Sequence, residues 1–172
     1  MINCIYSQFL ALIIVVKIQL IVIGKTNQNF VKQGLDEFCK RLEHYLPFEL
    51  EIISDIKNTK NLTVEQQKTK EGELILQSFQ IGDYIVLLDE RGKEFTSVNF
   101  AEFIEKKSHV GLKRLVFVVG GVYGFSPSVY EVAHENIALS KMTFPHQLIR
   151  LIFIEQLYRA MTILHNEPYH HE

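Results

Sequence analysis

The chain has 172 residues and a formal net charge of −2, with 47% hydrophobic and 22% charged residues. These values are typical of one globular domain with a buried core, and they exclude a disordered chain and a protein that binds nucleic acid through bulk charge alone. The two cysteines, Cys4 and Cys39, lack metal-binding or redox spacing, which favours reduced thiols in a cytoplasmic protein.

The first 16 residues are mostly apolar and invite comparison with a targeting or membrane segment. No basic residue precedes the apolar run, no small-residue cleavage site follows it, and Lys17 interrupts it. Val16 could mark the true start, because a GTG codon can initiate translation. We therefore interpret residues 1–16 as an extension from an upstream start and residues 17–172 as a single domain. A membrane anchor is the alternative.

The rest of the chain alternates between the hydrophobic periods of strands and helices. In chain order the pattern predicts a strand at 17–23, a helix at 27–46, a strand at 48–54, a polar loop at 55–62, a helix at 63–79, a strand at 84–90, a helix at 97–107, a strand at 114–120, a helix at 127–135, a strand at 137–143 and a last helix from Pro145. Thr63 begins a capping box, Ser126 and Pro127 form a helix start, and residues 91–92 are predicted to turn.

Strands that are apolar throughout and alternate with helices predict a mainly parallel sheet with helices on both faces. Ligands of such α/β domains bind beyond the carboxyl ends of the strands. Three segments are therefore expected at one edge: LLDERG (87–92), VVGGVYG (118–124) and LSKMT (139–143). The last helix is apolar around much of its girth, which indicates a subunit interface.

The glycine-rich segment after the fourth predicted strand suggests a ligand-binding loop. Its G-G-x-x-G spacing differs from the dinucleotide pattern G-x-G-x-x-G, and the sequence has no G-x-x-x-x-G-K-[ST] loop for a nucleoside triphosphate. Taken alone, it is equally compatible with a tight turn that lets the backbone pass close to a neighbour. Glu155 and Arg159, four residues apart on the last helix, are either a surface ion pair or a functional polar site.

Longer stretches are more specific than these short motifs. They are VVGGVYGFS (118–126), LSKMTFPHQLIRLIFIEQLYRA (139–160) and PYHHE (168–172), with KIQLIVIGK (17–25) at the front. Together they resemble the ribosomal RNA large subunit methyltransferase H family, small SPOUT-class enzymes that N3-methylate a pseudouridine in 23S rRNA. The resemblance covers residues 17–172.

The resemblance implies a SPOUT-type α/β knot, in which the C-terminal segment threads through a loop as a deep trefoil. It also implies a cytoplasmic homodimer that acts on the assembled ribosome, uses S-adenosylmethionine and needs neither a metal nor a membrane. The donor site that it implies consists of Leu88, Gly120, Leu139, Ser140, Lys141, Met142, Thr143 and Phe144.

The same resemblance implies that Glu155, Arg159, Tyr169 and His170 place the substrate and handle its proton. The acceptor is an imide N–H, which is a poor nucleophile until it loses its proton. We expect His170 or Glu155 to assist that loss, and Arg159 and Tyr169 to steady the base or a phosphate. Family tails usually carry a basic residue where this chain has His171.

Two alternatives remain open from the sequence. One is a SPOUT methyltransferase with another RNA target, such as a tRNA base. The other is a non-catalytic knotted dimer that binds adenosyl ligands or ribosomes without transferring a methyl group.

Overall fold

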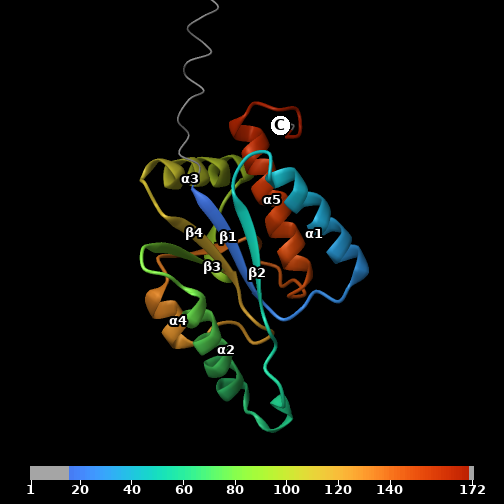
Figure 1. Cartoon of the computed structure of the whole chain (residues 1–172), viewed down its shortest axis with the longest axis vertical. Coiled ribbons are helices and arrows are strands. Elements are labelled where there is room, and N and C mark those ends of the chain that lie inside the picture. Colours follow the sequence, from blue (N-terminus) through green and yellow to red (C-terminus); the bar gives the residue numbers. More distant parts are fainter. Residues whose placement is uncertain (1–15, 171–172) are drawn as a thin grey trace, which may run out of the picture.

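The computed structural model describes residues 16–170 (Figure 1). Its strands are β1 (Lys17–Ile23), β2 (Phe48–Ile53), β3 (Asp83–Glu94), β4 (Arg114–Val119) and β5 (Glu135–Ala138). Its helices are α1 (Asn29–Leu42), α2 (Val64–Ser78), α3 (Ser97–His109), α4 (Pro127–Val132) and α5 (Leu148–Leu164), with a short 3-10 helix η1 (Thr59–Asn61). Apart from the buried Val16, the proposed extension of residues 1–16 lies outside the described residues.

The five strands form one sheet in the order β2-β1-β4-β3-β5, and every neighbouring pair is parallel. The predicted parallel α/β fold is therefore confirmed. Val119 at the end of β4 pairs with Val22 of β1 on one side and with Leu88 of β3 on the other. The carboxyl ends of these three central strands consequently lie at the same edge.

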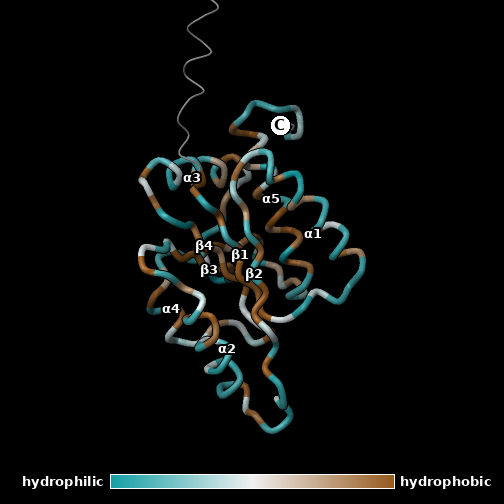
Figure 2. Tube along the Cα trace, viewed as in Figure 1, coloured by the Kyte–Doolittle hydropathy of each residue, from teal (hydrophilic) through white to brown (hydrophobic). Residues whose placement is uncertain are grey.

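Helices cover both faces of the sheet, and alternate residues of each strand point to opposite faces. In β1, Ile18, Leu20 and Val22 belong to the larger core, which packs against α1, α3 and α5. Ile21 and Ile23 belong to the smaller core beneath α2 and α4. Figure 2 shows that the strands of the sheet are mostly hydrophobic, whereas hydrophilic residues are frequent along α1 and α2.

Two predicted helix starts have different outcomes. At α2 the capping box is confirmed: the Gln66 N–H donates to Thr63 Oγ1 at 3.2 Å, and the Thr63 N–H donates to Gln66 Oε1 at 2.9 Å. At α4, Pro127 occupies the first turn as predicted, but the Ser126 side chain makes no cap. Its Oγ lies instead 2.9 Å from the Ser128 Oγ.

The turn predicted at residues 91–92 is wrong, because β3 continues to Glu94. A register shift between Leu88 and Lys93 bends β3 so that it pairs with β5 on both sides of the irregularity. Gly92 makes this possible, since a Cβ there would lie 2.6 Å from the backbone nitrogen of Ile137.

The end of the sheet differs from its sequence-based prediction as well. The strand predicted at 137–143 ends at Ala138, and α5 begins at Leu148 rather than at Pro145. The segment between β5 and α5 crosses the end of β3, where Lys141 Nζ donates to the Glu90 carbonyl at 3.4 Å and to the Gly92 carbonyl at 3.3 Å.

Arg150 joins α5 to the end of β1. Its side chain is completely buried and donates to the carbonyls of Ile23 at 2.5 Å and Gly24 at 2.7 Å, to Thr26 Oγ1 at 3.0 Å and to the His146 carbonyl at 3.1 Å. Burial lowers the pKa of this guanidinium. The principal acceptors of the Arg150 guanidinium are therefore backbone carbonyls. Without this donor, buried carbonyls would lose a hydrogen-bond partner.

Replacing Arg150 with Met should therefore destabilise the fold, because it leaves buried carbonyls without donors. We expect the free energy of unfolding, measured by urea denaturation, to fall by about 3 kcal/mol. The control is Lys106→Met, since Lys106 forms an exposed ion pair with Glu102 at 3.7 Å, and that change should stay within ~0.5 kcal/mol. Equal unfolding midpoints for the two variants would show that apolar contacts alone hold α5.

Candidate active site

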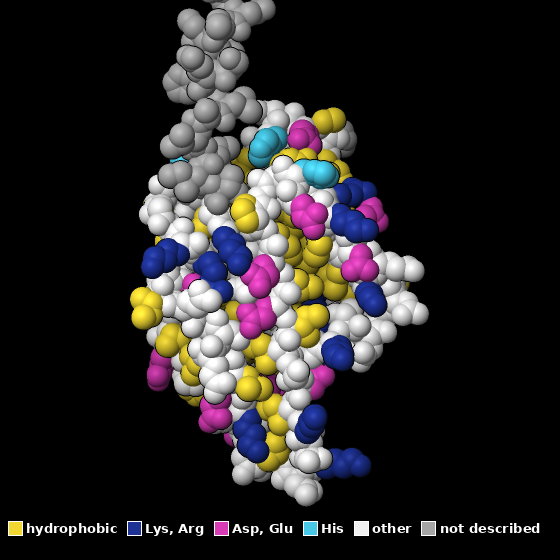
Figure 3. All heavy atoms as spheres, viewed as in Figure 1, with side chains coloured by type: hydrophobic (Ala, Val, Ile, Leu, Met, Phe, Trp, Pro, Cys, Tyr) yellow, Lys and Arg dark blue, Asp and Glu magenta, His cyan; other side chains and the backbone are white. Residues whose placement is uncertain are grey.

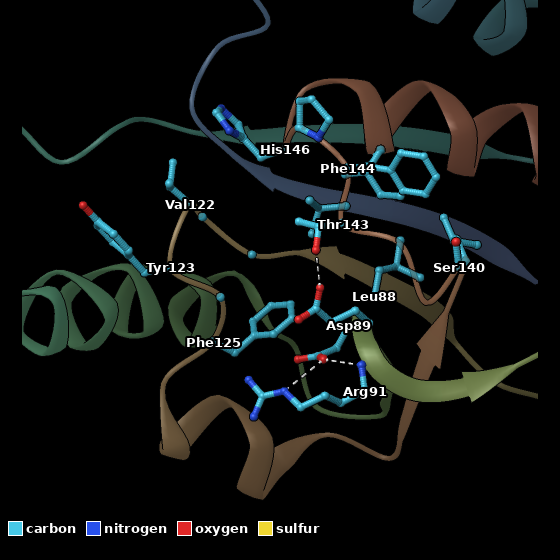
Figure 4. Close-up of a pocket in the computed structure, with 18 of the residues that line it drawn as sticks. Leu88, Asp89, Arg91, Val122, Tyr123, Phe125, Ser140, Thr143, Phe144 and His146 are labelled. Atoms are coloured by element: carbon cyan, nitrogen blue, oxygen red, sulfur yellow. Dashed lines mark hydrogen bonds and ion pairs between the residues drawn. The ribbon is translucent and has the colours of Figure 1, made fainter.

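A cavity of about 690 Å³ lies at the carboxyl edge of the central strands. Its volume is in the range of pockets that bind small organic ligands. The walls come from the end of β3, from the loop after β4 and from the segment that leads into α5 (Figure 4). These are the three segments that the sequence predicted at one edge.

The glycine turn, residues Gly121–Gly124, forms one wall with backbone rather than with side chains. The Gly124 N–H donates to the Gly121 carbonyl at 3.1 Å, and Gly124 has a φ of +79°, which favours glycine. Val122 and Tyr123 at the tip are exposed. The segment is thus both a tight turn and a cavity wall, so both readings of the G-G-x-x-G pattern apply.

Carboxylates occupy the β3 side of the cavity. Asp89 Oδ1 accepts a hydrogen bond from the Arg91 N–H at 2.8 Å, and the Tyr130 hydroxyl donates to the other oxygen of Asp89. Burial, together with this carboxylate, raises the pKa of Tyr130 to about 12. Glu90 Oε2 accepts from Thr143 Oγ1 at 3.0 Å. Arg91 Nε lies 3.6 Å from Asp89 Oδ1 and offsets part of this negative charge, so two carboxylates and one guanidinium border the cavity. The remaining excess of negative charge suits a cationic ligand better than a phosphate.

Most of the donor-site residues implied by the sequence lie together around the cavity. Those in its walls are Leu88, Gly120, Leu139, Ser140, Met142, Thr143 and Phe144. Lys141 does not line it, because its ammonium group reaches the carbonyls at the end of β3 instead.

Several residues in the walls were not among the donor-site residues implied by the sequence, including Asp89, Phe125 and His146. Asp89 directly follows Leu88, and His146 lies two positions after Phe144, so closeness to these residues is a signal that could have identified both. Phe125 had no such signal, because only the glycine turn directs it to the cavity. Burial, and then the positive charge of Arg150, lower the pKa of His146, which favours a neutral imidazole.

A second cluster brings together three of the predicted catalytic residues. Glu155 Oε1 accepts hydrogen bonds from Arg159 Nη2 at 2.6 Å and from the Tyr169 hydroxyl at 3.1 Å. The Arg159 guanidinium carbon lies 4.7 Å from the centre of the Tyr169 ring. Burial and the Glu155 carboxylate raise the pKa of Tyr169. We call Glu155, Arg159, Tyr169 and the adjacent His170 the tail cluster.

The structure does not bring the tail cluster to the cavity of the same chain. None of its four residues lines the cavity. Ile149 at the start of α5 does line it, and Arg159 follows ten residues later, or about 15 Å along the helix axis. In Figure 1 the C-terminal tail lies at the top, whereas the strands run away from it toward their carboxyl ends.

Residues 16–170 contain neither a membrane-spanning helix nor a metal-binding cluster of acidic, His or Cys side chains. No helix in this part of the chain is long and apolar enough to cross a membrane. The same residues contain no group of three or more His, Cys, Asp or Glu side chains placed to hold a metal ion.

Comparison with known proteins relates the whole described chain to one family. A family model described as "Predicted SPOUT methyltransferase" matches residues 16–170. Proteins named ribosomal RNA large subunit methyltransferase H are similar to the chain: that of Parabacteroides distasonis is 67% identical over 156 residues, and that of Phocaeicola vulgatus 58% over 156, each covering 91% of this chain and 99% of the relative. That of Christiangramia forsetii is 58% identical over 154 residues, 90% of this chain and 98% of the relative.

These matches extend through the parallel sheet, the cavity walls and α5, so they cover the structural features described above. The chain belongs to the SPOUT methyltransferase family, a family of methyltransferases whose fold is the α/β knot expected from the sequence.

Proposed function

We propose that the protein transfers a methyl group from S-adenosylmethionine to N3 of a pseudouridine in 23S rRNA, on the assembled ribosome in the cytoplasm. We assign this reaction to the single domain of residues 17–172. The observation that carries the proposal is the 67% identity, over 91% of the chain, to a relative named for methylation of large-subunit ribosomal RNA.

The cavity fits this methyl donor. Backbone at the glycine turn leaves room for a nucleoside, and Leu88, Leu139 and Phe144 supply apolar surface for a base. Asp89 and Glu90 place negative charge at the same cavity, which suits the positive charge of a sulfonium and an ammonium group. When bound, the donor supplies a methyl group attached to sulfonium, which is an electrophile.

The tail cluster supplies the remaining functions. Glu155 already accepts hydrogen bonds from Arg159 and Tyr169, which favours a role in orienting them. Arg159 and Tyr169 then hold the base or its phosphate in line with the methyl group. We assign acceptance of the imide proton to His170, because Glu155 is already engaged by Arg159 and Tyr169.

A second copy of the chain is needed to complete the site. In one chain the tail cluster lies away from the cavity, so methyl transfer requires a tail from elsewhere. On α5, Leu151 and Tyr158 pack against residues of α1 or the loop after it, whereas the partly exposed Ile152 offers apolar surface that a partner can cover. We therefore propose a homodimer in which the tail cluster of one chain meets the cavity of the other.

Recognition of the ribosome does not depend on a dominant positive charge. The net charge is −2, and on the face shown in Figure 3 basic and acidic side chains are intermingled. Binding to RNA through phosphate contacts alone requires many cationic groups on one surface. We infer that the shape of the assembled particle contributes to recognition.

Donor specificity gives a direct prediction. Because the cavity carries carboxylates, isothermal titration calorimetry should show binding of S-adenosylmethionine and no detectable binding of NAD, whose pyrophosphate those carboxylates repel. Binding of NAD with equal affinity would contradict the assignment of the cavity.

The RNA target is tested in cells. Mass spectrometry of 23S rRNA nucleosides from a strain that lacks the gene should show loss of N3-methylpseudouridine. The wild-type gene and a His44→Ala control, altered at an exposed histidine that neither lines the cavity nor belongs to the tail cluster, should restore it, whereas His170→Ala should not. An unchanged nucleoside profile in the deletion strain would refute this substrate and leave another RNA target or a non-catalytic role.

Subunit complementation tests the shared site. Arg159→Ala removes a tail residue, and Ser140→Trp fills the cavity; each variant should be inactive alone on ribosomes from the deletion strain. Two different affinity tags allow the mixed dimer to be purified. In the mixed dimer, the cavity of the Arg159→Ala chain meets the tail of the Ser140→Trp chain, and this site is intact. The other site carries both changes. The activity of the mixed dimer should therefore be about half that of the wild-type dimer. An inactive mixed dimer would show that cavity and tail act within one chain.

A further inference from the structure

A buried carboxyl group lies directly behind the glycine turn. Glu71, on α2, is 4% exposed, and its Oε1 accepts a hydrogen bond from Gln67 Nε2 at 2.8 Å. Its other oxygen, Oε2, is buried and has no hydrogen-bond partner among the described residues. Burial of a carboxyl oxygen without a partner is unfavourable, so its presence needs a physical reason.

The group that faces this oxygen is Gly121. A Cβ at Gly121 would lie 2.1 Å from Glu71 Oε2, so no other residue type fits there without a shift. The next residue of α2 approaches the same loop, because a Cβ at Gly72 would lie 2.1 Å from Ser126 Oγ. Helix α2 is therefore packed at two consecutive positions against the segment that forms a cavity wall.

Charged groups near Glu71, within the described residues, do not offset the negative charge of its carboxylate. Burial raises the pKa of this carboxyl, the hydrogen bond from Gln67 lowers it, and the negative charge of Asp55, after β2, raises it further. Within residues 16–170, no lysine, arginine or histidine forms an ion pair with it. An apolar side chain of similar length would fill the same space without this unfavourable burial.

We propose that Glu71 is a positioning residue for the methyl-donor site, whose carboxyl group holds the glycine turn in its ligand-binding conformation. When the cavity is filled, Oε2 accepts a hydrogen bond from a backbone N–H of the turn. Glu71 does not line the cavity itself, so it acts on the donor through Gly121. The inference rests on the proposed function, because the ligand that fills the cavity is S-adenosylmethionine.

A purely structural role and a positioning role predict different results. If Glu71 only fills space, its replacement changes stability and leaves donor affinity unchanged. If it positions the turn, replacement relieves the unpartnered oxygen and so stabilises the fold, while donor affinity falls. Opposite changes in stability and affinity are typical of groups that are retained for binding.

The test compares Glu71→Gln and Glu71→Met with Glu73→Gln, which alters an exposed carboxylate on the same helix. We expect Glu71→Met to raise the Tm by about 3 °C and Glu71→Gln, which removes the charge but keeps a buried polar group, to raise it less. Calorimetry should show a dissociation constant for S-adenosylmethionine that rises about tenfold in Glu71→Met and less in Glu71→Gln, which keeps an acceptor oxygen. Glu73→Gln should change neither quantity. The donor KM should rise together with the dissociation constant, whereas kcat at saturating donor should stay near the wild-type value.

The pH dependence supplies a second measurement. The carboxylate form accepts the N–H, so donor affinity of the wild type should rise with pH through the raised pKa of Glu71, and this dependence should be absent in Glu71→Gln. The donor affinities of the wild type and of Glu71→Gln are compared at each pH between pH 5 and pH 8. Other titrating groups, including His146, affect both proteins equally, so the difference in affinity reports on Glu71.

The outcomes separate this inference from the proposed function. If the wild type binds S-adenosylmethionine and both Glu71 variants bind it equally well, the positioning role is refuted and the proposed function stands. If the wild type does not bind S-adenosylmethionine, the proposed function fails, and the inference fails with it. Glu71→Gln keeps the side-chain shape, so the test remains decisive if Glu71→Met does not fold.

Discussion

Complete burial of β4 is the constraint on which the rest of the structure depends. All residues of Arg114–Val119 are buried between β1 and β3 and beneath helices on both faces. A ligand has no access to such a sheet except at its ends, and the parallel register places the ends of three strands at one edge. The chain leaves β4 through glycines, so backbone forms part of the cavity wall at this point.

The chemistry of the cavity follows from what borders it. The glycine turn offers space, the segment after β5 offers apolar side chains, and the end of β3 offers Asp89 and Glu90. Each carboxylate is held by a hydroxyl donor, Tyr130 for the first and Thr143 for the second. A phosphate-binding loop would present an excess of cationic groups and N–H donors, whereas this cavity has two carboxylates against one guanidinium, that of Arg91, which pairs with Asp89. The contrast favours a sulfonium ligand.

Helix α5 relates the two clusters to each other. Its first turn borders the cavity and is fixed to β1 by Arg150, while its later turns carry Glu155 and Arg159 toward the tail. A straight helix keeps these groups apart, because its length is set by the number of residues. The separation is a physical reason for a dimer, since a second chain can bring its tail to the cavity.

Hydrophobic periodicity in the sequence was sufficient to predict the parallel α/β class, the strand 17–23 and the three segments at one edge, because burial on both faces makes strands apolar throughout. Seven of the eight donor-site residues that the resemblance to the methyltransferase H family implied line the cavity, and their role in binding the donor stays a prediction. The resemblance did not predict which residues contact each other in three dimensions, and the roles of the tail cluster remain predictions.

Contacts between segments far apart in the sequence decided the features that no local pattern predicted. The continuation of β3 past Gly92 depends on its pairing with β5, the position of Phe125 depends on the glycine turn, and the contact of Glu71 with Gly121 joins α2 to the loop after β4. No local pattern encodes such contacts, because each requires two parts of the chain to be folded against each other. Local sequence therefore determined the class of fold and the family, and the tertiary structure decided which residues share a cavity and which lie too far away.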